Sequence, residues 1–366
     1  MIIKSMSDPI IKEDCSRVIA SVGDLFQVLG GKTILITGAN GFLPSFFIDT
    51  LLGLNEGVLL KNPVRIIALT RRLAEKNERL KHCLTDPQVK IFQADVAVPF
   101  EIGERIDYVI HAASKASPSD YLRNPIDTID ANVWGTRHLL EFARLNPVTS
   151  FLFISSGEIY GSPDEKNVPI REDYNGNVNP IGTRSGYQES KRFGETLCYN
   201  FWKVYGIPVK IARPFHTYGP RLLLSDGRVI PEFMRRCFAG EDLEVVRHGS
   251  SIRTFSYISD TVDAVWRILL RGTSGEAYNV GSEEEISVQE LAKLFVKIFE
   301  NAVNVEYSDE KRFPDLVATP QITTPDISKI KNDLGYKPHV SFTVGIERLK
   351  KWYELYGALY AKQKTK

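Results

Sequence analysis

Residues 34–44 read ILITGANGFLP, an apolar run followed by two glycines and the start of a helical pattern. The run predicts a buried strand, and Gly38 and Gly41 fit a tight turn that directs backbone N–H groups toward a ligand. A helix that begins after such a turn can bind a pyrophosphate, because its free N–H groups and its dipole favour an anion. The alternative is a strand-to-helix turn without a ligand. Pro44 stands where a third glycine often allows close packing, and proline is tolerated in a first helical turn.

Strand-like and helical patterns alternate from this stretch to about residue 220. The apolar runs are KTILITG, VRIIALT, VKIFQAD, IDYVIHAA, SFLFISS and PVKIARP. Helices are expected through FFIDTLLGL, in the charged stretch after VRIIALT, near 125–145 and around 187–205. Strands separated by helices predict an α/β fold with a Rossmann-type, doubly wound parallel sheet. Ligands of such folds bind at the carboxyl edge of the sheet.

The two ends of the chain follow other patterns. Residues 9–29 have apolar side chains at helical spacing and predict one amphipathic helix packed on the main domain. Beyond residue 220, EDLEVV, AYNVGS and the closing helix VGIERLKKWYELYGALY suggest a smaller, interleaved α/β region over the sheet edge. We therefore expect a helical extension (1–30), a mainly dinucleotide-binding domain (31–215, with a segment near 255–272 returning to it) and a mainly substrate-binding region (216–366).

The composition is that of an ordinary globular protein. Of 366 residues, 43% are hydrophobic and 25% charged, and 46 Lys and Arg balance 45 acids. Without a net basic field, nucleic acid and anionic membranes are not expected as partners. The four cysteines and six histidines are scattered without ligand spacing, so we expect no metal site. No signal peptide or long apolar run is evident, and we expect a reducing, cytoplasmic location.

The heptapeptide SGYQESK, residues 185–191, places Tyr187 and Lys191 four positions apart. On a helix these side chains share one face, so the Lys191 ammonium can lie near the Tyr187 phenol and favour the phenolate. A solvated polar helix face is the alternative. Beside a bound dinucleotide, Tyr187 would be the general base that removes a hydroxyl proton while hydride leaves the carbon. Lys191 would hold the nicotinamide ribose and lower the pKa of the phenol.

This combination resembles the short-chain dehydrogenase/reductase superfamily, in its extended branch of NAD-dependent epimerases and dehydratases. The motifs ISSGEIYG, RPFHTYGP, SYISD, AYNVGS and LGYKP carry the resemblance over about residues 31–355. Within that branch the chain is most similar to UDP-glucuronate decarboxylases, through ASKASPSDYLRNP, REDYNGNVNPIGTRSGYQESKR, DGRVIPEF and IRTFSYISD. The resemblance implies a nucleotide-sugar substrate, a bound NAD, and a homodimer formed through the helices near 125–145 and 187–205.

The resemblance also implies catalytic roles for Ser156, Glu158 and Arg253, in addition to Tyr187 and Lys191. Ser156 would share a hydrogen bond with the reacting hydroxyl, Glu158 would act as acid or base at the neighbouring carbon, and Arg253 would pair with a carboxylate. Structural roles are the alternative, as turn caps for Ser156 and Glu158 and as a surface ion pair for Arg253. An epimerase or a dehydratase of another nucleotide sugar is the alternative reaction, and a cofactor-binding sensor or scaffold is the alternative class.

The implied cofactor site leaves the choice of dinucleotide open. Thr70 ends the second strand, where an NAD enzyme usually has an acid for the adenosine ribose. Arg71 and Arg72 could pair with the 2′-phosphate of NADP, or they could face water. The implied cofactor contacts are Gly38, Asn40, Gly41, Phe42, Leu43, Thr70, Arg71, Asp95, Val96, Ala112, Ala113, Ser114, Tyr187, Lys191 and Pro214. The implied substrate contacts are Tyr121, Arg184, His216, Arg221, Arg228 and Arg253.

Three residues depart from the decarboxylase pattern. Gly157 replaces a serine, and the sugar 4,6-dehydratases have at this position an aspartate that protonates the departing 6-hydroxyl. His216 replaces an asparagine, and Val246 replaces a tyrosine that packs near the nucleotide base. Gly157 cannot supply that proton, and simple 4-epimerases usually lack the glutamate, so Glu158 favours chemistry at C5. His216 and Val246 leave the nucleotide and the sugar open.

Overall fold

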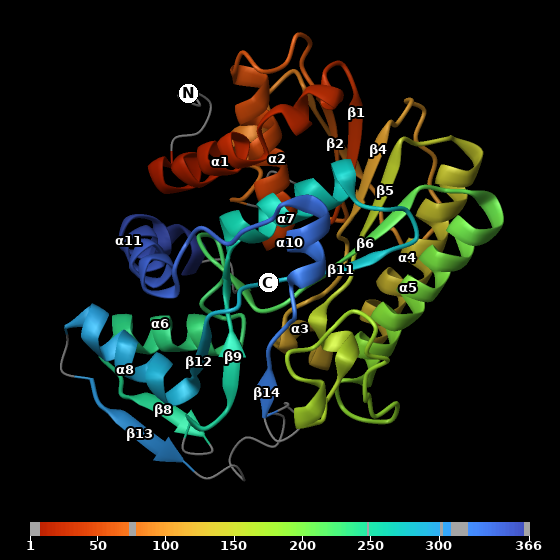
Figure 1. Ribbon diagram of the computed structural model, residues 1–366. Helices are drawn as coiled ribbons and strands as arrows, with labels where there is room; N and C mark the ends of the chain where they lie inside the picture. The colour runs from red at the N-terminus through yellow and green to blue at the C-terminus, as the bar shows by residue number, and fades with distance from the viewer. Residues whose placement is uncertain (1–7, 73–77, 247–248, 301–302, 309–320, 362–366) are drawn as a thin grey trace.

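A seven-stranded parallel sheet forms the centre of the computed structural model, which describes residues 8–72, 78–246, 249–300, 303–308 and 321–361 (Figure 1). The strand order is β11-β6-β5-β4-β1-β2-β3. The strands are β1 (Thr33–Thr37), β2 (Arg65–Thr70), β3 (Val89–Gln93), β4 (Tyr108–His111), β5 (Ser150–Ile154), β6 (Val209–Pro214) and β11 (Ala277–Val280). All neighbouring pairs are parallel, as the alternation of strands and helices predicted.

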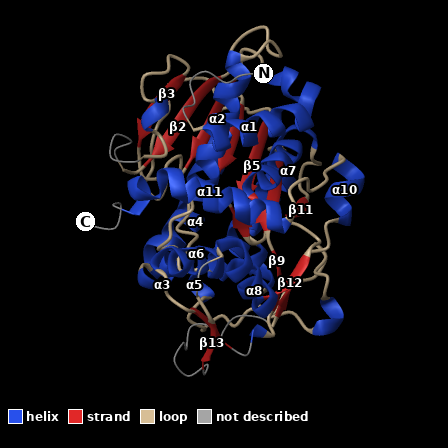
Figure 2. Cartoon of the chain, turned by 90° about the vertical axis from the view of Figure 1, so that its left-hand side faces the viewer, coloured by secondary structure: helices blue, strands red, loops and turns tan. Residues whose placement is uncertain are grey.

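Helices cover both faces of this sheet. Within β1, Ile34 and Ile36 face one apolar cluster while Leu35 faces the other, because successive side chains of a strand point to opposite faces. Figure 2 shows α1 and α2 in front of the strands. The covering helices are α1 (Pro9–Val22), α2 (Phe42–Glu56) and α7 (Ile258–Arg271) on one face, and α4 (Pro125–Leu145) and α5 (Ser185–Tyr205) on the other. Strands buried on both faces therefore read as continuous apolar runs.

Two expected helices differ from the structure. The single helix over 9–29 is wrong, because α1 ends at Val22 and a 3-10 helix follows over Gly23–Leu29. Gly23 has φ +57°, a conformation that ends an α-helix and that glycine adopts at little cost. Of the charged stretch after β2, residues 73–77 lie outside the described residues, and residues 78–88 form turns and a short 3-10 helix over Lys81–Cys83.

The smaller region consists of short sheets and helices over the carboxyl edge of the large sheet. Its sheets have the orders β10-β7, β12-β9-β14 and β13-β8. The expected division of the chain did not include β11 in the large sheet, although AYNV pairs in parallel with β6. The elements outside the large sheet and its covering helices are α3 (Pro118–Arg123), β7 (Thr217–Tyr218), α6 (Val229–Ala239), β8 (Leu243–Val246), β9 (Ile252–Thr254), β10 (Ser256–Tyr257), β12 (Glu285–Ser287), α8 (Val288–Phe299), β13 (Val305–Ser308), β14 (Ile322–Thr323), α10 (Ser328–Leu334) and α11 (Phe342–Ala361).

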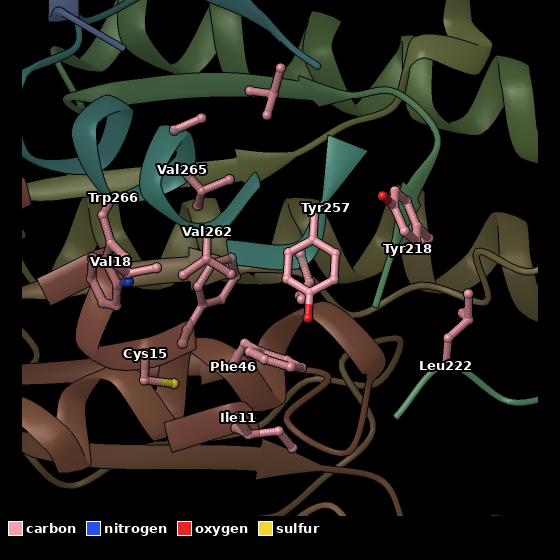
Figure 3. Close-up of a cluster of buried hydrophobic side chains, with 14 of the residues drawn as sticks. Ile11, Cys15, Val18, Phe46, Tyr218, Leu222, Tyr257, Val262, Val265 and Trp266 are labelled. Carbon is pink, nitrogen blue, oxygen red and sulfur yellow. The ribbon is translucent and has the colours of Figure 1, made fainter. Parts of the chain in front are cut away.

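Helix α1 is anchored between its neighbours α2 and α7 and the helix α11. Cys15 and Val18 lie among the buried side chains of α2 and α7 (Figure 3). The buried Asp14 pairs with Arg348 of α11 at 2.6 Å and accepts a hydrogen bond from the Tyr257 hydroxyl at 2.8 Å. Burial raises the pKa of Asp14 to about 6, despite the neighbouring arginine. No helix in the described part of the chain is long and apolar enough to cross a membrane.

Candidate active site

The glycine loop after β1 lies directly against the end of β4. Gly38 has φ +68°, and a Cβ built there would lie 2.7 Å from the Cα of Ala113, so no other residue fits without displacing backbone. The Thr37 hydroxyl accepts hydrogen bonds from the N–H groups of Ala112 and Ala113, both at 3.2 Å. It therefore donates its own proton to Nδ1 of His111, 2.8 Å away, since burial lowers the pKa of His111 to about 3. This network fixes the two strand ends that border the loop.

The loop leaves the beginning of α2 open to a ligand. Gly41 is the N-cap of α2, where the described residues provide no capping side chain. The first N–H groups of the helix, those of Phe42 and Leu43, have no partner within the helix. Pro44 lies in the same first turn, where its missing N–H costs nothing. This geometry suits a pyrophosphate, as the sequence indicated.

Two buried polar atoms beside this loop also fit a dinucleotide. The Oδ1 atom of Asn40 and the Oγ atom of Ser114 have no hydrogen-bond partner within the described residues. An unpaired buried oxygen costs free energy that a ligand hydroxyl or amide can recover. Both residues belong to the expected cofactor contacts, and the residues present therefore fit the group.

The end of β2 and the end of β3 meet beside the loop. Thr70 donates its hydroxyl hydrogen to the Arg72 carbonyl at 3.0 Å, and the Asn40 amide donates to the same oxygen at 3.3 Å. The Arg71 guanidinium, which is 45% exposed, pairs with Asp95 at 3.5 Å and with Asp127 at 3.8 Å. Asp127 also pairs with Lys115, at 2.6 Å, so Arg71 shares that carboxylate with a closer cation, and Asp95 is its nearer partner.

Tyr187 and Lys191 lie one turn apart on α5 and are both buried. Lys191 donates a hydrogen bond to the Ile154 carbonyl at 2.7 Å, and burial lowers its pKa to about 7. Burial also raises the pKa of Tyr187 to about 12, although a hydrogen bond with Ser156 acts in the opposite direction. In this structure burial outweighs the influences that lower the pKa of the phenol, and a lowering by Lys191 beside a bound dinucleotide stays a prediction.

Tyr121 on α3 stacks on the ring of Tyr187, with 4.9 Å between the ring centres and 11° between the planes. Arg184, just before α5, lies 5.9 Å from the centre of the Tyr121 ring. The Tyr121 hydroxyl and the Nε of Arg184 are buried and unpaired within the described residues. Beside the phenol of Tyr187, the Tyr121 hydroxyl can therefore donate a hydrogen bond to a ligand or accept one from it, and the Arg184 Nε–H can donate one.

Glu158 lies in the 3-10 helix that follows β5. Its carboxylate accepts hydrogen bonds from Arg184 at 2.6 Å and from the Gln188 amide at 3.2 Å. Burial raises the pKa of Glu158, but the charge of Arg184 and these hydrogen bonds outweigh it, so the pKa lies below the usual range. Glu158 is therefore an ionised carboxylate at neutral pH. Gln188 was not predicted, although it lies within SGYQESK, because a glutamine has no chemistry that marks it in a sequence.

Gly157 has no room for a side chain. A Cβ built there would lie 2.9 Å from three atoms of the Phe215 ring. Phe215 is buried and packs near Tyr160, with 6.0 Å between the ring centres. The position that carries an aspartate in the dehydratases is thus closed by an aromatic ring.

His216 follows Phe215 and is half-buried beside the charged residues of the site. Its Nε2 has no partner among the described side chains and backbone, and burial, with the charge of Arg253, lowers its pKa to about 3. Arg253 on β9 donates to the carbonyls of Ile252 at 2.7 Å and Gln321 at 3.0 Å. His216 is therefore neutral, and it lies near enough to Arg253 and Glu158 for both charges to act on its pKa.

The structure brings most of the predicted residues together, but not all of them. Arg228 forms an ion pair with Asp226 and lies near enough to Tyr187 to lower the pKa of its phenol. Arg221 points instead to Asp49 of α2, at 2.6 Å, and lies over the ring of Phe46. Two other predicted positions lie at the sheet edge or in it. Val96 packs on Gly135 of α4, and Pro214 ends β6 beside Val280.

Val246, the third departure from the decarboxylase pattern, ends β8 and pairs in register with Ser308 of β13. Val246 therefore lies in the smaller region rather than in the seven-stranded sheet. No group of three or more His, Cys, Asp or Glu side chains within the described ranges could hold a metal ion.

Comparisons with known proteins agree with this geometry. The model of the NAD dependent epimerase/dehydratase family matches residues 34–281. UDP-glucuronic acid decarboxylase 3 of Arabidopsis thaliana is 36% identical over 88% of this chain and 89% of its own length. UDP-glucuronic acid decarboxylase 1 of Danio rerio is 33% identical over 87% of this chain and 71% of its own length.

Solved structures share the fold. An epimerase from Methanothermobacter thermautotrophicus has a TM-score of 0.79 and 27% identity, and the match covers 94% of this chain and 98% of that one. UDP-glucuronic acid 4-epimerase from Bacillus cereus, in complex with UDP-glucuronic acid and NAD, has a TM-score of 0.74 and 22% identity, over 88% and 99% of the two chains. At the latter identity the likeness is one of fold.

Proposed function

We propose, from the premise that the chain belongs to the NAD dependent epimerase/dehydratase family, that it decarboxylates UDP-glucuronate by transient oxidation at C4. The general class of enzyme follows from the family: the chain is an NAD-dependent enzyme that modifies a nucleotide sugar. The specific reaction, decarboxylation, is supported by the ionised Glu158, which Arg184 and Gln188 hold beside Tyr187. Relatives at 33–36% identity that are UDP-glucuronic acid decarboxylases support the same reaction.

In this reaction Tyr187 acts on the sugar hydroxyl. The residues around Gly38 and Gly41 would hold NAD+, which would supply a hydride acceptor for C4 and a positive charge. Tyr187 takes the O4 proton, with Ser156 sharing the hydrogen bond, and its pKa must fall from about 12 for this step. When the ketone is reduced again, Tyr187 returns that proton to O4.

Glu158 and Arg253 act at the carboxylate end of the sugar. Oxidation at C4 makes a β-keto acid, which loses CO2 because the ketone accepts the electron pair of the broken carbon–carbon bond. Arg253 orients the carboxylate before this step. Glu158, ionised at the outset, binds the proton source and directs one proton to C5 after CO2 leaves. Net consumption of one proton balances the loss of CO2 from a carboxylate.

The test is incubation with a panel of nucleotide sugars, followed by mass spectrometry for loss of CO2, loss of water or no change in mass. Tyr187→Phe should lower turnover by about 10²–10⁴-fold, the usual cost of removing a general acid or base. Tyr307→Phe, on β13 away from α4 and α5 and 45% exposed, is the control and should keep full activity. Glu158→Gln should allow the first oxidation, so that NADH absorbance accumulates, whereas Glu189→Gln should not.

A 4-epimerase acting on another nucleotide sugar is the second candidate, favoured by the neutral His216 in place of an asparagine. It predicts a product of unchanged mass and a Glu158→Gln variant with wild-type turnover. A dehydratase is disfavoured, because Phe215 closes the position of the aspartate that such enzymes use. Cofactor binding without turnover on any sugar would instead favour a sensor.

We propose NAD rather than NADP as the cofactor. Arg71 is paired with Asp95 at 3.5 Å and more distantly with Asp127, whose nearer partner is Lys115, so a 2′-phosphate would have to compete chiefly with Asp95 for its charge. Titration of the wild-type protein with each dinucleotide should give the tighter binding with NAD+. If NADP+ binds more tightly and Arg71→Ala reverses the preference, the assignment is wrong.

We also propose that a second copy of the chain covers α4 and α5. Large apolar side chains are exposed along both helices, and the family likeness points to the same pair. Sedimentation at micromolar concentration should give a dimer, and Trp134→Glu should give a monomer. Val58→Glu, at a residue that is 96% exposed against 54% for Trp134 and that lies outside these helices, should leave the dimer unchanged. The exposed apolar residues of the two helices are Ile126, Trp134, Leu145, Phe193, Tyr199, Val204 and Tyr205.

A further inference from the structure

A buried arginine outside the expected site joins the glycine loop to the substrate region. Arg79, which is 8% exposed, donates from Nη1 to the Asn40 carbonyl at 3.1 Å. Its Nη2 and Nε donate to the Arg221 carbonyl at 2.7 and 3.3 Å. The guanidinium is a rigid planar fork, so the position of one carbonyl constrains the position of the other.

The second carbonyl belongs to an unusual residue. Arg221 has φ +69°, a conformation that costs a non-glycine residue free energy and that persists only where the surroundings hold it. Its side chain is held by Asp49 at 2.6 Å, and Asp49 also contacts His82 at 2.6 Å. Arg79 and His82 belong to the same short segment. This segment therefore restrains the Arg221 backbone directly, through Arg79, and the Arg221 side chain indirectly, through His82 and Asp49.

Arg221 is the third residue of the segment 219–228, which extends to the catalytic tyrosine. The Ser225 carbonyl accepts a hydrogen bond from Ser119 of α3, the helix that carries Tyr121, at 3.5 Å. At the end of the segment, Arg228 lies near enough to Tyr187 for its charge to lower the pKa of the phenol. The position of this segment therefore determines where the guanidinium of Arg228 lies in the proposed substrate site.

We propose that Arg79 is a positioning residue that couples the cofactor loop to segment 219–228, so that a dinucleotide bound at the loop orders the segment for the substrate. The inference rests on the proposed function, because it takes residues 38–44 as the cofactor loop. A ligand pyrophosphate that fixes the loop fixes the Asn40 carbonyl, and through the guanidinium it restrains the Arg221 carbonyl. Cofactor binding and substrate binding then favour each other.

The test is hydrogen–deuterium exchange of the full chain with and without saturating NAD+, after removal of any cofactor that co-purifies. In the wild-type protein, NAD+ should slow exchange in 38–45 and, about tenfold, in 219–228, within the usual range of coupling between sites. In Arg79→Met, NAD+ should still slow exchange in 38–45 but change it less than about twofold in 219–228. The KM for the nucleotide sugar should rise in this variant more than kcat falls.

Arg267→Met is the matched control, because Arg267 likewise bridges two backbone carbonyls, those of Ser21 and Leu334, away from the site. It should keep the NAD+-dependent slowing in 219–228. If Arg79→Met does not fold, Arg79→Lys keeps the charge but cannot bridge both carbonyls, and it should show a reduced slowing. Slowing confined to 38–45 in the wild type, or unchanged slowing in the Arg79 variants, would overturn the coupling alone. Absence of slowing in both segments of the wild type would overturn the cofactor assignment and the coupling with it.

Discussion

Replacing Gly157 with alanine is expected to destabilise the fold, because the new Cβ would lie 2.9 Å from the Phe215 ring. Carbon atoms in contact prefer about 3.5–4.0 Å, so ring or backbone must move by more than half an ångström. The nearest ring atoms include Cγ, which cannot swing away as the end of a flexible side chain can. Such overpacking costs about 1–3 kcal/mol of unfolding free energy.

Urea denaturation measures this difference directly. Gly103→Ala is the control, because a Cβ at Gly103 meets nothing within 4 Å and its backbone is not in the left-handed region. That variant should be neutral or more stable by about 0.4–1 kcal/mol, since alanine restricts the unfolded chain. Turnover by Gly157→Ala should also fall, because the neighbouring Glu158 carboxylate would be displaced from Arg184.

A double-mutant cycle identifies the ring as the cause. Phe215→Leu leaves space above residue 157, so the cost of Gly157→Ala should shrink in that background, with a coupling of about 0.5–3 kcal/mol. Equal unfolding free energies for the Gly157 and Gly103 variants, or strictly additive effects in the cycle, would refute the reasoning. The steric argument that separates this chain from the dehydratases would then fail as well.

Two further predictions concern stability. Burial raises the pKa of Asp260 to about 6, so its contribution to stability is complete below pH 4 and is lost as the pH rises through 6. Asp260→Asn keeps an acceptor for the Val340 N–H and should remove this pH dependence, about 3 kcal/mol in unfolding free energy between pH 4 and 7; an unchanged profile would contradict it. Asp8→Ala removes the N-cap of α1 and the partner of the Trp352 indole, and thermal unfolding should show a loss of about 1–2 kcal/mol, against none for the exposed Asp24→Ala.

The sequence predicted the large sheet because its strands are buried on both faces. A run such as TILIT is buried at every position, so it can be recognised as a continuous apolar stretch. The intervening helices can be recognised by their apolar stripes. The i, i+4 spacing likewise placed Tyr187 and Lys191 on one face of α5. These predictions depend on residues close together in the chain, where periodicity and backbone geometry are sufficient.

The remaining features depend on contacts between distant residues. Nothing in ISSGEIYG shows that Phe215 lies over Gly157, and nothing around Arg79 shows that it meets Asn40 and Arg221. The strand AYNV is short enough to be assigned to either region until β6 is seen beside it. The pKa of Tyr187 depends on burial, which the sequence of a polar heptapeptide does not indicate.

The contact between Asp14 and Arg348 also has a consequence for biosynthesis. The two residues are 334 positions apart, and a ribosome that adds 5–20 residues per second needs about 20–70 s to cover that interval. During that time the carboxylate of Asp14 lacks its arginine, and the neighbouring apolar face of α1 can meet only the helices already made. A nascent-chain chaperone that binds amphipathic helices therefore has tens of seconds in which to hold α1 before α11 emerges to displace it.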